Sequence, residues 1–113
     1  MRIVDVYLTT AAAQLGAAVP TTAYPAGVRS ICAYLVYADS RPGLDTYSYR
    51  FAGGAGVFFR DAAHRPDVAH GVALDCFDTG GDLPPGRYTV TVLLDGEAAR
   101  TLRFTVSSPP VTP

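Results

Sequence analysis

Short segments rich in β-branched and aromatic residues run along the whole chain, separated by clusters of Gly, Pro and Asp. None of them sustains the 3.6-residue apolar period of an amphipathic helix, and Gly, Pro and Asp favour turns. The segments span residues 2–9, 28–37, 46–51, 57–60 and 71–77, followed by the two arms of a hairpin over 87–106. Many short strands with turn signals between them are typical of a sandwich. The sequence therefore predicts an all-β fold, an antiparallel β-sandwich of about seven strands.

The length of the chain fits one domain. At 113 residues it lies in the usual range for a single hydrophobic core. We expect this domain to span residues 1–106 and the Pro/Ser/Thr-rich residues 107–113 to form a linker or tail. Such a tail predicts a domain of a larger, exported protein located outside the cell or in the cell envelope, with no signal peptide in this chain itself.

Charge and hydropathy exclude several classes of partner. The formal net charge is −1, which predicts neither a nucleic acid nor an anionic membrane as partner. The longest apolar stretches, such as residues 31–38, are far shorter than the roughly 20 residues of a membrane-spanning helix. All nine basic residues are arginines, so chemistry that depends on a lysine, such as a Schiff base, is excluded.

Alternation assigns the faces of three segments. Segment 28–37 is apolar on both faces, so we expect a central strand. In segment 46–51, Tyr47, Tyr49 and Phe51 alternate with small or polar residues, so the three aromatic side chains should face the core. In segment 71–77, Val72 and Leu74 are expected in the core, which places Cys76 on the same face.

The clearest motif lies near the C-terminal end. Residues 83–88 read Leu-Pro-Pro-Gly-Arg-Tyr and lead into the alternating residues 89–92, so the phenol of Tyr88 is placed to bond back to the backbone. This segment resembles the tyrosine corner of fibronectin type III and related bacterial immunoglobulin-like domains, and the hairpin over 87–106 resembles their closing hairpin. The resemblance implies an immunoglobulin-like or fibronectin type III-like accessory domain of a secreted bacterial protein. It also implies that Tyr49 takes the place of the tryptophan found on the third strand of antibody domains.

The loop of this hairpin decides which face its second arm presents. With a two-residue loop at Asp95 and Gly96, Val90 would lie opposite Thr101, and the apolar residues of the two arms would point to opposite faces. A three-residue loop over 94–96, with Gly96 left-handed in a bulge, puts Tyr88 opposite Leu102 and keeps one apolar face. The sequence therefore predicts the bulged, three-residue loop.

Two cysteines are placed on strands that often lie side by side in this architecture. A disulfide between Cys32 and Cys76 is one expectation, since an exported domain permits it. Against it, Cys32 lies on the face opposite Ile31 and Leu35, whereas Cys76 is expected on the core face. The alternative is two buried, inert thiols, and the sequence leaves both open.

One polar segment carries four residues of metal-ligating type. Asp61, His64, Asp67 and His70 recur every three residues. Arg65 and Pro66 interrupt any regular helix there, and in an extended strand alternate members would point to opposite faces. A metal site is therefore the minor hypothesis, and a solvated surface connection is the major one. An acidic stretch around Gly80 is likewise expected to be a turn rather than a calcium site.

No catalytic set stands out. Both histidines lie in one short connection, and no Gly-x-Ser-x-Gly motif or glycine-rich phosphate loop occurs, so we expect no enzyme activity and no cofactor. Tyr34, Phe58 and Phe59 are the candidate partner surface. Adjacent Phe58 and Phe59 should point to opposite faces of a strand, which leaves one outside the core.

Three functions remain on these grounds. The first is a non-catalytic module that spaces or docks neighbouring domains of the parent chain or binds another protein. The second is a carbohydrate-binding module, which requires a coplanar exposed pair among Tyr34, Tyr47, Phe58 and Phe59. The third is a metal-binding domain, which requires at least three of Asp61, His64, Asp67 and His70 to converge.

Overall fold

The protein folds into eight β-strands. The structure, a computed structural model, describes residues 1–10 and 19–109. The strands are β1 (Arg2–Thr10), β2 (Ala23–Tyr24), β3 (Ser30–Ala38), β4 (Tyr47–Gly53), β5 (Gly56–Arg60), β6 (Gly71–Asp78), β7 (Gly86–Leu94) and β8 (Glu97–Val106). Within these residues no helix is long and apolar enough to cross a membrane.

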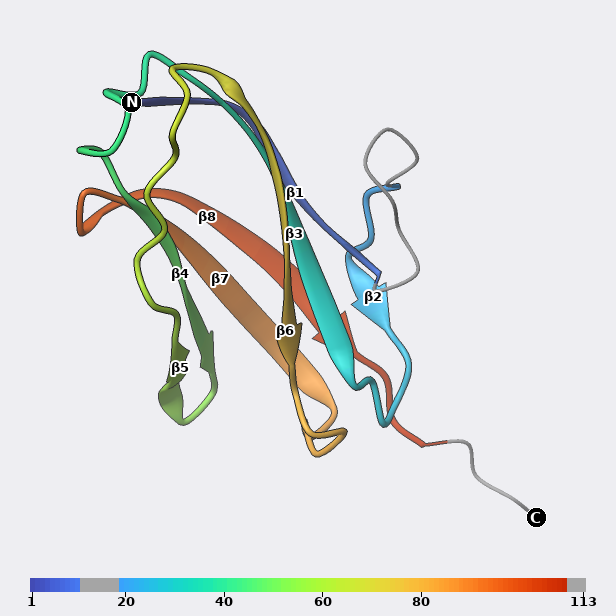
Figure 1. The fold of residues 1–113 in the computed structure, drawn as a ribbon. Coiled ribbons are helices and arrows are strands. Elements are labelled where there is room, and N and C mark those ends of the chain that lie inside the picture. The colour runs from blue at the N-terminus through green and yellow to red at the C-terminus, as the bar shows by residue number, and fades with distance from the viewer. Residues whose placement is uncertain (11–18, 110–113) are drawn as a thin grey trace.

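The strands form two sheets that face each other (Figure 1). One sheet has three strands in the order β1-β3-β6, and the other has five in the order β2-β8-β7-β4-β5. All pairings are antiparallel except that of β2 with β8. The predicted all-β sandwich-like arrangement is confirmed, and β3 is the central strand of its sheet as expected. The two-residue strand β2 is an addition, since no strand was predicted between residues 9 and 28.

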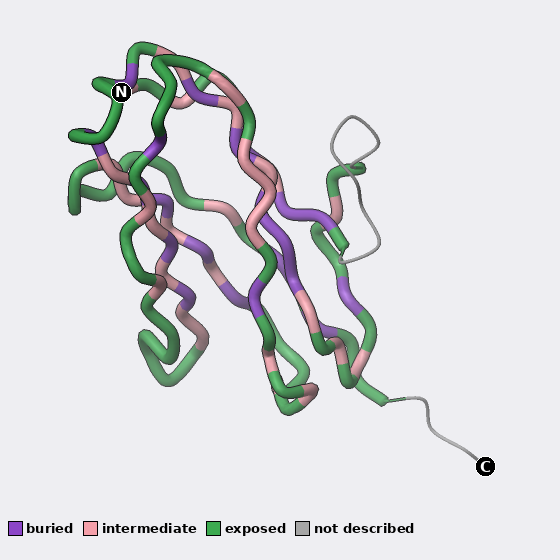
Figure 2. Tube along the Cα trace, in the orientation of Figure 1, coloured by how far each residue is buried: buried purple, intermediate pink, exposed green. Residues whose placement is uncertain are grey.

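The buried residues lie along the facing strands of the two sheets (Figure 2). Many of them are aromatic. Tyr47, Tyr49 and Phe51 of β4 are 6%, 1% and 2% exposed, as the alternation predicts. Tyr49 and Phe51 both pack edge-to-face against Phe77 of β6, with ring centroids 5.3 and 5.2 Å apart. Such aromatic pairs bring the inner faces of the two sheets together.

The face assigned to β6 from the sequence was wrong. Val72 is 44% exposed and points outward with Leu74 and Cys76, whereas Phe77 is buried. Asp75 shares the inward face with Phe77, and the hydroxyl of Tyr47 donates to its carboxylate at 3.1 Å. The inward face of this strand therefore carries Asp75 beside Phe77, and its outward face is also apolar, so the buried face cannot be identified from apolar residues alone.

The three-residue loop expected between β7 and β8 was also wrong. Leu93 lies opposite Ala98, and the turn consists of Asp95 and Gly96 alone, both at positive φ. Two adjacent residues at positive φ make the tight turn whose twist matches that of the two strands. The register then shifts by one residue beyond Leu93, so Tyr88 pairs with Phe104. This bulge in β8 keeps the apolar residues of both strands on one face. The prediction from the sequence had placed the bulge in the loop.

Tyr88 closes the end of this sheet. Its hydroxyl donates to the backbone carbonyl of Pro84, four residues earlier, in the geometry expected from the sequence. Its ring stacks on Phe104, with centroids 5.1 Å apart. The hydrogen bond and the stack together fix the start of β7 against β8.

Candidate functional site

The polar segment after β5 brings only part of the candidate metal set together. The Nε2 atom of His64 lies 2.6 Å from Oδ2 of Asp61. Asp67 and His70 are exposed on the same connection and do not join them. Across residues 1–10 and 19–109, no group of three or more His, Cys, Asp or Glu side chains converges. The convergence that the metal-binding hypothesis requires is therefore missing from the described part of the chain.

The Asp61–His64 pair belongs instead to a polar patch at one end of the core. The His64 ring stacks on Tyr47 with centroids 4.9 Å apart, and the backbones of these two residues exchange both hydrogen bonds. Burial, followed by the nearby charge of Asp75, raises the pKa of Tyr47 and of Tyr49 above the usual phenol range. The hydroxyl of Tyr49 is buried without a hydrogen-bond partner among the described residues.

This patch lacks the parts of a nucleophilic site. An acid–histidine pair activates a hydroxyl or thiol only when that group lies within hydrogen-bond reach of the second ring nitrogen. Among the described residues, His64 makes its side-chain hydrogen bond to Asp61 and to no Ser, Thr or Cys. The arrangement holds the segment after β5 against β4.

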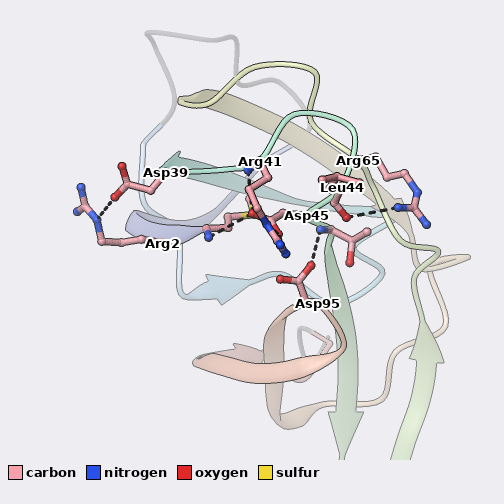
Figure 3. A network of polar contacts seen from close by, with 9 residues as sticks. Arg2, Asp39, Arg41, Leu44, Asp45, Arg65 and Asp95 are labelled. Atoms are coloured by element: carbon pink, nitrogen blue, oxygen red, sulfur yellow. Dashed lines mark hydrogen bonds and ion pairs between the residues drawn. The ribbon is translucent and has the colours of Figure 1, made fainter.

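A second polar network lies in the loop between β3 and β4 (Figure 3). The guanidinium of Arg41 donates to Oδ1 of Asp45 at 2.6 and 2.9 Å, and the Arg41 backbone N–H donates to Oδ2 at 2.8 Å. These hydrogen bonds hold the pKa of Asp45 well below its usual range. The carboxylate of Asp95 accepts from the backbone of Thr46, which ties the β7–β8 turn to the start of β4. The network holds the loop between β3 and β4 in place and connects it to the turn between β7 and β8.

The two cysteines form a disulfide within one sheet. Cys32 of β3 and Cys76 of β6 lie directly opposite each other, with an S–S distance of 2.08 Å. The sequence argument against the bond failed because it placed Cys76 in the core, whereas both sulfur atoms lie on the outer face of the three-stranded sheet. Tyr34 lies on the same face and stacks on Tyr7 of β1, with centroids 5.0 Å apart.

Phe58 and Phe59 lie at an open edge of the molecule. The expectation that they point to opposite faces was wrong, because the register of β4 and β5 shifts at this point and leaves Phe58 as the extra residue of a bulge. Both rings therefore contact Phe51 edge-to-face, with centroids 6.2 and 5.7 Å away. They remain 49% and 38% exposed. The bulge thus presents two phenylalanines together at one edge.

The candidate aromatic surface is consequently divided. Tyr34 lies on the outer face of the three-stranded sheet, Phe58 and Phe59 lie at the edge of the five-stranded sheet, and Tyr47 is buried. The carbohydrate-binding hypothesis can therefore draw on Phe58 and Phe59 alone, and both of these rings pack edge-to-face against Phe51.

One candidate surface was not predicted from the sequence. On the outer face of the five-stranded sheet, Arg50, Arg60, Arg87 and Arg103 stand among threonines. The signal was present as alternation, because arginine and threonine alternate with core residues along β7 and β8. The net charge of −1 gave no sign of this surface, because a net charge does not show where the charged side chains lie.

Comparisons with known proteins extend the description of the fold only. No family model and no curated protein matches the chain. Among solved structures, the chain is similar to the Pseudomonas fluorescens alkylpurine DNA glycosylase AlkC, determined bound to DNA containing an abasic site analog. The identity is 16% and the TM-score 0.57, with 95% of this chain and 30% of that chain covered. The chain thus spans less than a third of the glycosylase, and the likeness shows a shared fold.

Proposed function

We propose that the chain is a non-catalytic β-sandwich module, of the immunoglobulin-like or fibronectin type III-like kind, within a larger exported protein. In this proposal its β5 edge docks onto an extended apolar segment of a neighbouring protein domain. One observation carries the proposal: every residue of β5 is exposed, although Val57, Phe58 and Phe59 are large and apolar (Figure 2).

The edge position of β5 explains what it can bind. β5 is the last strand of its sheet, so one row of its backbone N–H and C=O groups faces away from β4. Native proteins usually protect such edges with charges, proline or a covering segment. The only charged residue in β5 is Arg60. An extended segment that pairs with this edge would satisfy the free backbone groups and cover the apolar side chains, as in β-strand addition.

Hollows on both sides of Phe58 favour a segment with apolar side chains. The smaller hollow, about 220 Å³, is lined by Phe58, Phe59 and Leu83. The larger, about 790 Å³, is lined by Val57, Phe58, Leu83 and the two prolines that follow Leu83. Fully burying one phenylalanine side chain contributes about 1.5–3 kcal/mol, and these two are still 49% and 38% exposed, so covering them gains a little under half of that value for each.

One further observation supports a module of a longer protein, and another supports export. The similar domain of the DNA glycosylase makes up 30% of its chain, so this fold occurs there as part of a longer protein. The Cys32–Cys76 disulfide fits an oxidising compartment, where such bonds persist.

Hydroxyl-radical footprinting of the natural full-length protein and of the isolated 113-residue chain tests the docking. We expect the oxidation of Phe58 and Phe59 to be several-fold lower in the full-length protein, because the neighbouring segment covers them. Tyr34 serves as the internal reference, since it lies on the other sheet, and its oxidation should not change. Equal oxidation of the two phenylalanines in both samples overturns the proposal.

A matched pair of variants sharpens the test. Val57→Asp and Val72→Asp change residues that are both 44% exposed, one on β5 and one on β6. In the full-length protein, Val57→Asp should restore the oxidation of Phe58, whereas Val72→Asp should leave it low. If the isolated chain instead sediments as a dimer that Val57→Asp dissociates, the occupant of the edge is a second copy, and the proposal of a neighbouring domain fails.

A further inference from the structure

The outer face of the five-stranded sheet is cationic. Strand register places alternate residues of β4, β5, β7 and β8 on this face, opposite the core. It carries four arginines and four threonines, namely Arg50, Arg60, Arg87, Arg103, Thr89, Thr91, Thr101 and Thr105. All ten acidic residues of the chain lie in other positions. A chain of nearly neutral net charge therefore presents one face of a single sign.

These arginines are not neutralised by the protein itself. Among the described residues, no ion pair or hydrogen bond occupies the guanidinium of any of the four. The residues outside the description, 11–18 and 110–113, contain no Asp or Glu in their sequence. Their guanidinium groups, each a planar fork of five N–H donors, remain available to an external anion.

The placement of the arginines has an energetic cost without a ligand. Arg50 and Arg60 lie directly opposite each other in the β4–β5 register. Like charges in such a cross-strand pair are destabilising, and an anion lying between them reverses the sign of that effect. Arg87 and Arg103 are diagonal neighbours across β7 and β8, at a spacing of about 7–8 Å. The four charges thus form two pairs.

The two pairs lie too far apart for one small anion. Arg50 lies opposite Thr91 and Arg103 lies opposite Thr89, so these nearest members of the two pairs are two strand spacings and two residues apart, about 12 Å between Cα atoms. A hollow of about 700 Å³ lies on this face, beside Thr22, Arg87, Thr89, Arg103 and Thr105. A ligand that engages both pairs must therefore be elongated and carry repeated negative groups, with one residue seated in the hollow.

We propose that this face binds an acidic glycan, a polysaccharide that carries carboxylate or sulfate groups. Arginine forks bind such planar or tetrahedral anions through two parallel hydrogen bonds, and threonine hydroxyls both donate to and accept from sugar hydroxyls. The recognition is ionic, which distinguishes it from the aromatic stacking on which the carbohydrate-binding hypothesis depends. The module then holds its parent protein to an anionic matrix by one face, while β5 remains available at the edge.

Two features favour a glycan over a nucleic acid. Single-stranded nucleic acids are held by exposed aromatic side chains on which bases stack. Every aromatic side chain of β4, β7 and β8 is buried, so this face offers no such platform. The disulfide fits an oxidising compartment outside the nucleic-acid-containing cytosol.

Binding of defined polymers to the full 113-residue chain tests the proposal. The probes are heparin as the sulfated glycan, polygalacturonate as the carboxylated glycan, neutral dextran, and a 24-base-pair DNA duplex, each titrated at low and at physiological salt. We expect one or both acidic glycans to bind with an affinity that falls as salt rises, and dextran not to bind. The duplex should bind more weakly than the better glycan.

Two double variants of equal charge locate the site. Arg87→Gln with Arg103→Gln removes one arginine pair from the face. Arg2→Gln with Arg65→Gln removes the same charge from exposed loop and edge positions elsewhere. Losing charge-assisted hydrogen bonds should weaken glycan binding at least about tenfold in the first variant, and less than about twofold in the second. Unchanged thermal midpoints confirm that both variants are folded.

Three outcomes overturn the proposal. The first is that neither acidic glycan binds. The second is an equal loss of affinity in both double variants, which indicates diffuse attraction without a site. The third is a duplex that binds more tightly than either glycan and is lost in the first variant, which assigns the face to nucleic acid.

Discussion

Removing the Cys32–Cys76 disulfide should lower stability by an amount set by the loop that it closes. The two cysteines are 44 positions apart in the sequence. In the chain-entropy model, closing a loop of this length restricts the unfolded chain by about 13 cal/mol/K, which is about 4 kcal/mol at 25 °C. The unfolding entropy of a domain of this size is about 240 cal/mol/K, so the thermal midpoint should fall by about 15–20 °C on reduction.

Differential scanning calorimetry of the oxidised and the reduced protein measures this directly, with alkylation and mass spectrometry to count free thiols. The variant with Cys32→Ala and Cys76→Ala is the control, because its midpoint should lie near that of the reduced protein and should not respond to reductant. Cys32 is fully buried, so the substitution adds a small packing loss of its own. A midpoint that moves by less than about 5 °C on complete reduction refutes the reasoning from loop entropy.

Three further predictions concern single side chains. The Tyr24 hydroxyl donates to a buried strand carbonyl at 2.8 Å, and burial raises its pKa to about 12, so Tyr24→Phe should lower the free energy of unfolding by about 1–2 kcal/mol; a denaturation midpoint equal to wild type contradicts this. The pKa of Asp45 is lowered by folding, so its contribution to stability is present above about pH 4 and is lost as the pH falls further. The difference in unfolding free energy between wild type and Asp45→Asn, measured by urea denaturation, should therefore shrink below about pH 4. A difference that stays constant with pH rules out this linkage. A Cβ atom at Gly53 would lie 2.9 Å from the ring of Tyr88, whereas a Cβ atom at Gly54 would meet nothing within 4 Å. In thermal unfolding, Gly53→Ala should therefore destabilise the protein by about 1–3 kcal/mol, and Gly54→Ala should not.

The strands that alternate cleanly could be read from the sequence. Tyr47, Tyr49 and Phe51 alternate with polar residues, and the structure buries all three. The buried face of β6 could not be predicted in this way, because alternation identifies the buried face only where the outward face is polar. Here Val72 points outward, and Asp75 points inward where the hydroxyl of Tyr47 satisfies it. That hydrogen bond depends on pairing between distant segments, which alternation within one strand does not contain.

The hairpin shows a different limit. Keeping the apolar residues of both arms on one face required one extra, unpaired residue in the hairpin, and that requirement was correct. Its position was not determined, since a bulge in the loop and a bulge within β8 both keep Leu102 and Phe104 on the apolar face. Asp95 can adopt positive φ because Asp tolerates the left-handed region, which permits the two-residue turn.

The candidate site was predictable only where neighbours in sequence are neighbours in space. Asp61 and His64 meet across a single turn of the connection, but Asp67 and His70 do not join them. The arginine face is the opposite case. Its members come from residues 50 to 103 and are brought together by strand register, so alternation within one strand shows single outward arginines but not the face that they form together.

The disulfide lies within the three-stranded sheet, and this location has a mechanical consequence. The start of β1 and the end of β8 lie at opposite ends of the sandwich and belong to different sheets (Figure 1). Tension applied to the two ends therefore shears one sheet along the other, and no described covalent bridge joins the sheets to resist it. After the sheets separate, the disulfide between β3 and β6 still closes a loop of 44 positions. That loop would span about 150 Å if it were fully extended, and the disulfide prevents this extension. Under load, the protein would lengthen by a limited, fixed step and keep the middle of its chain gathered for refolding.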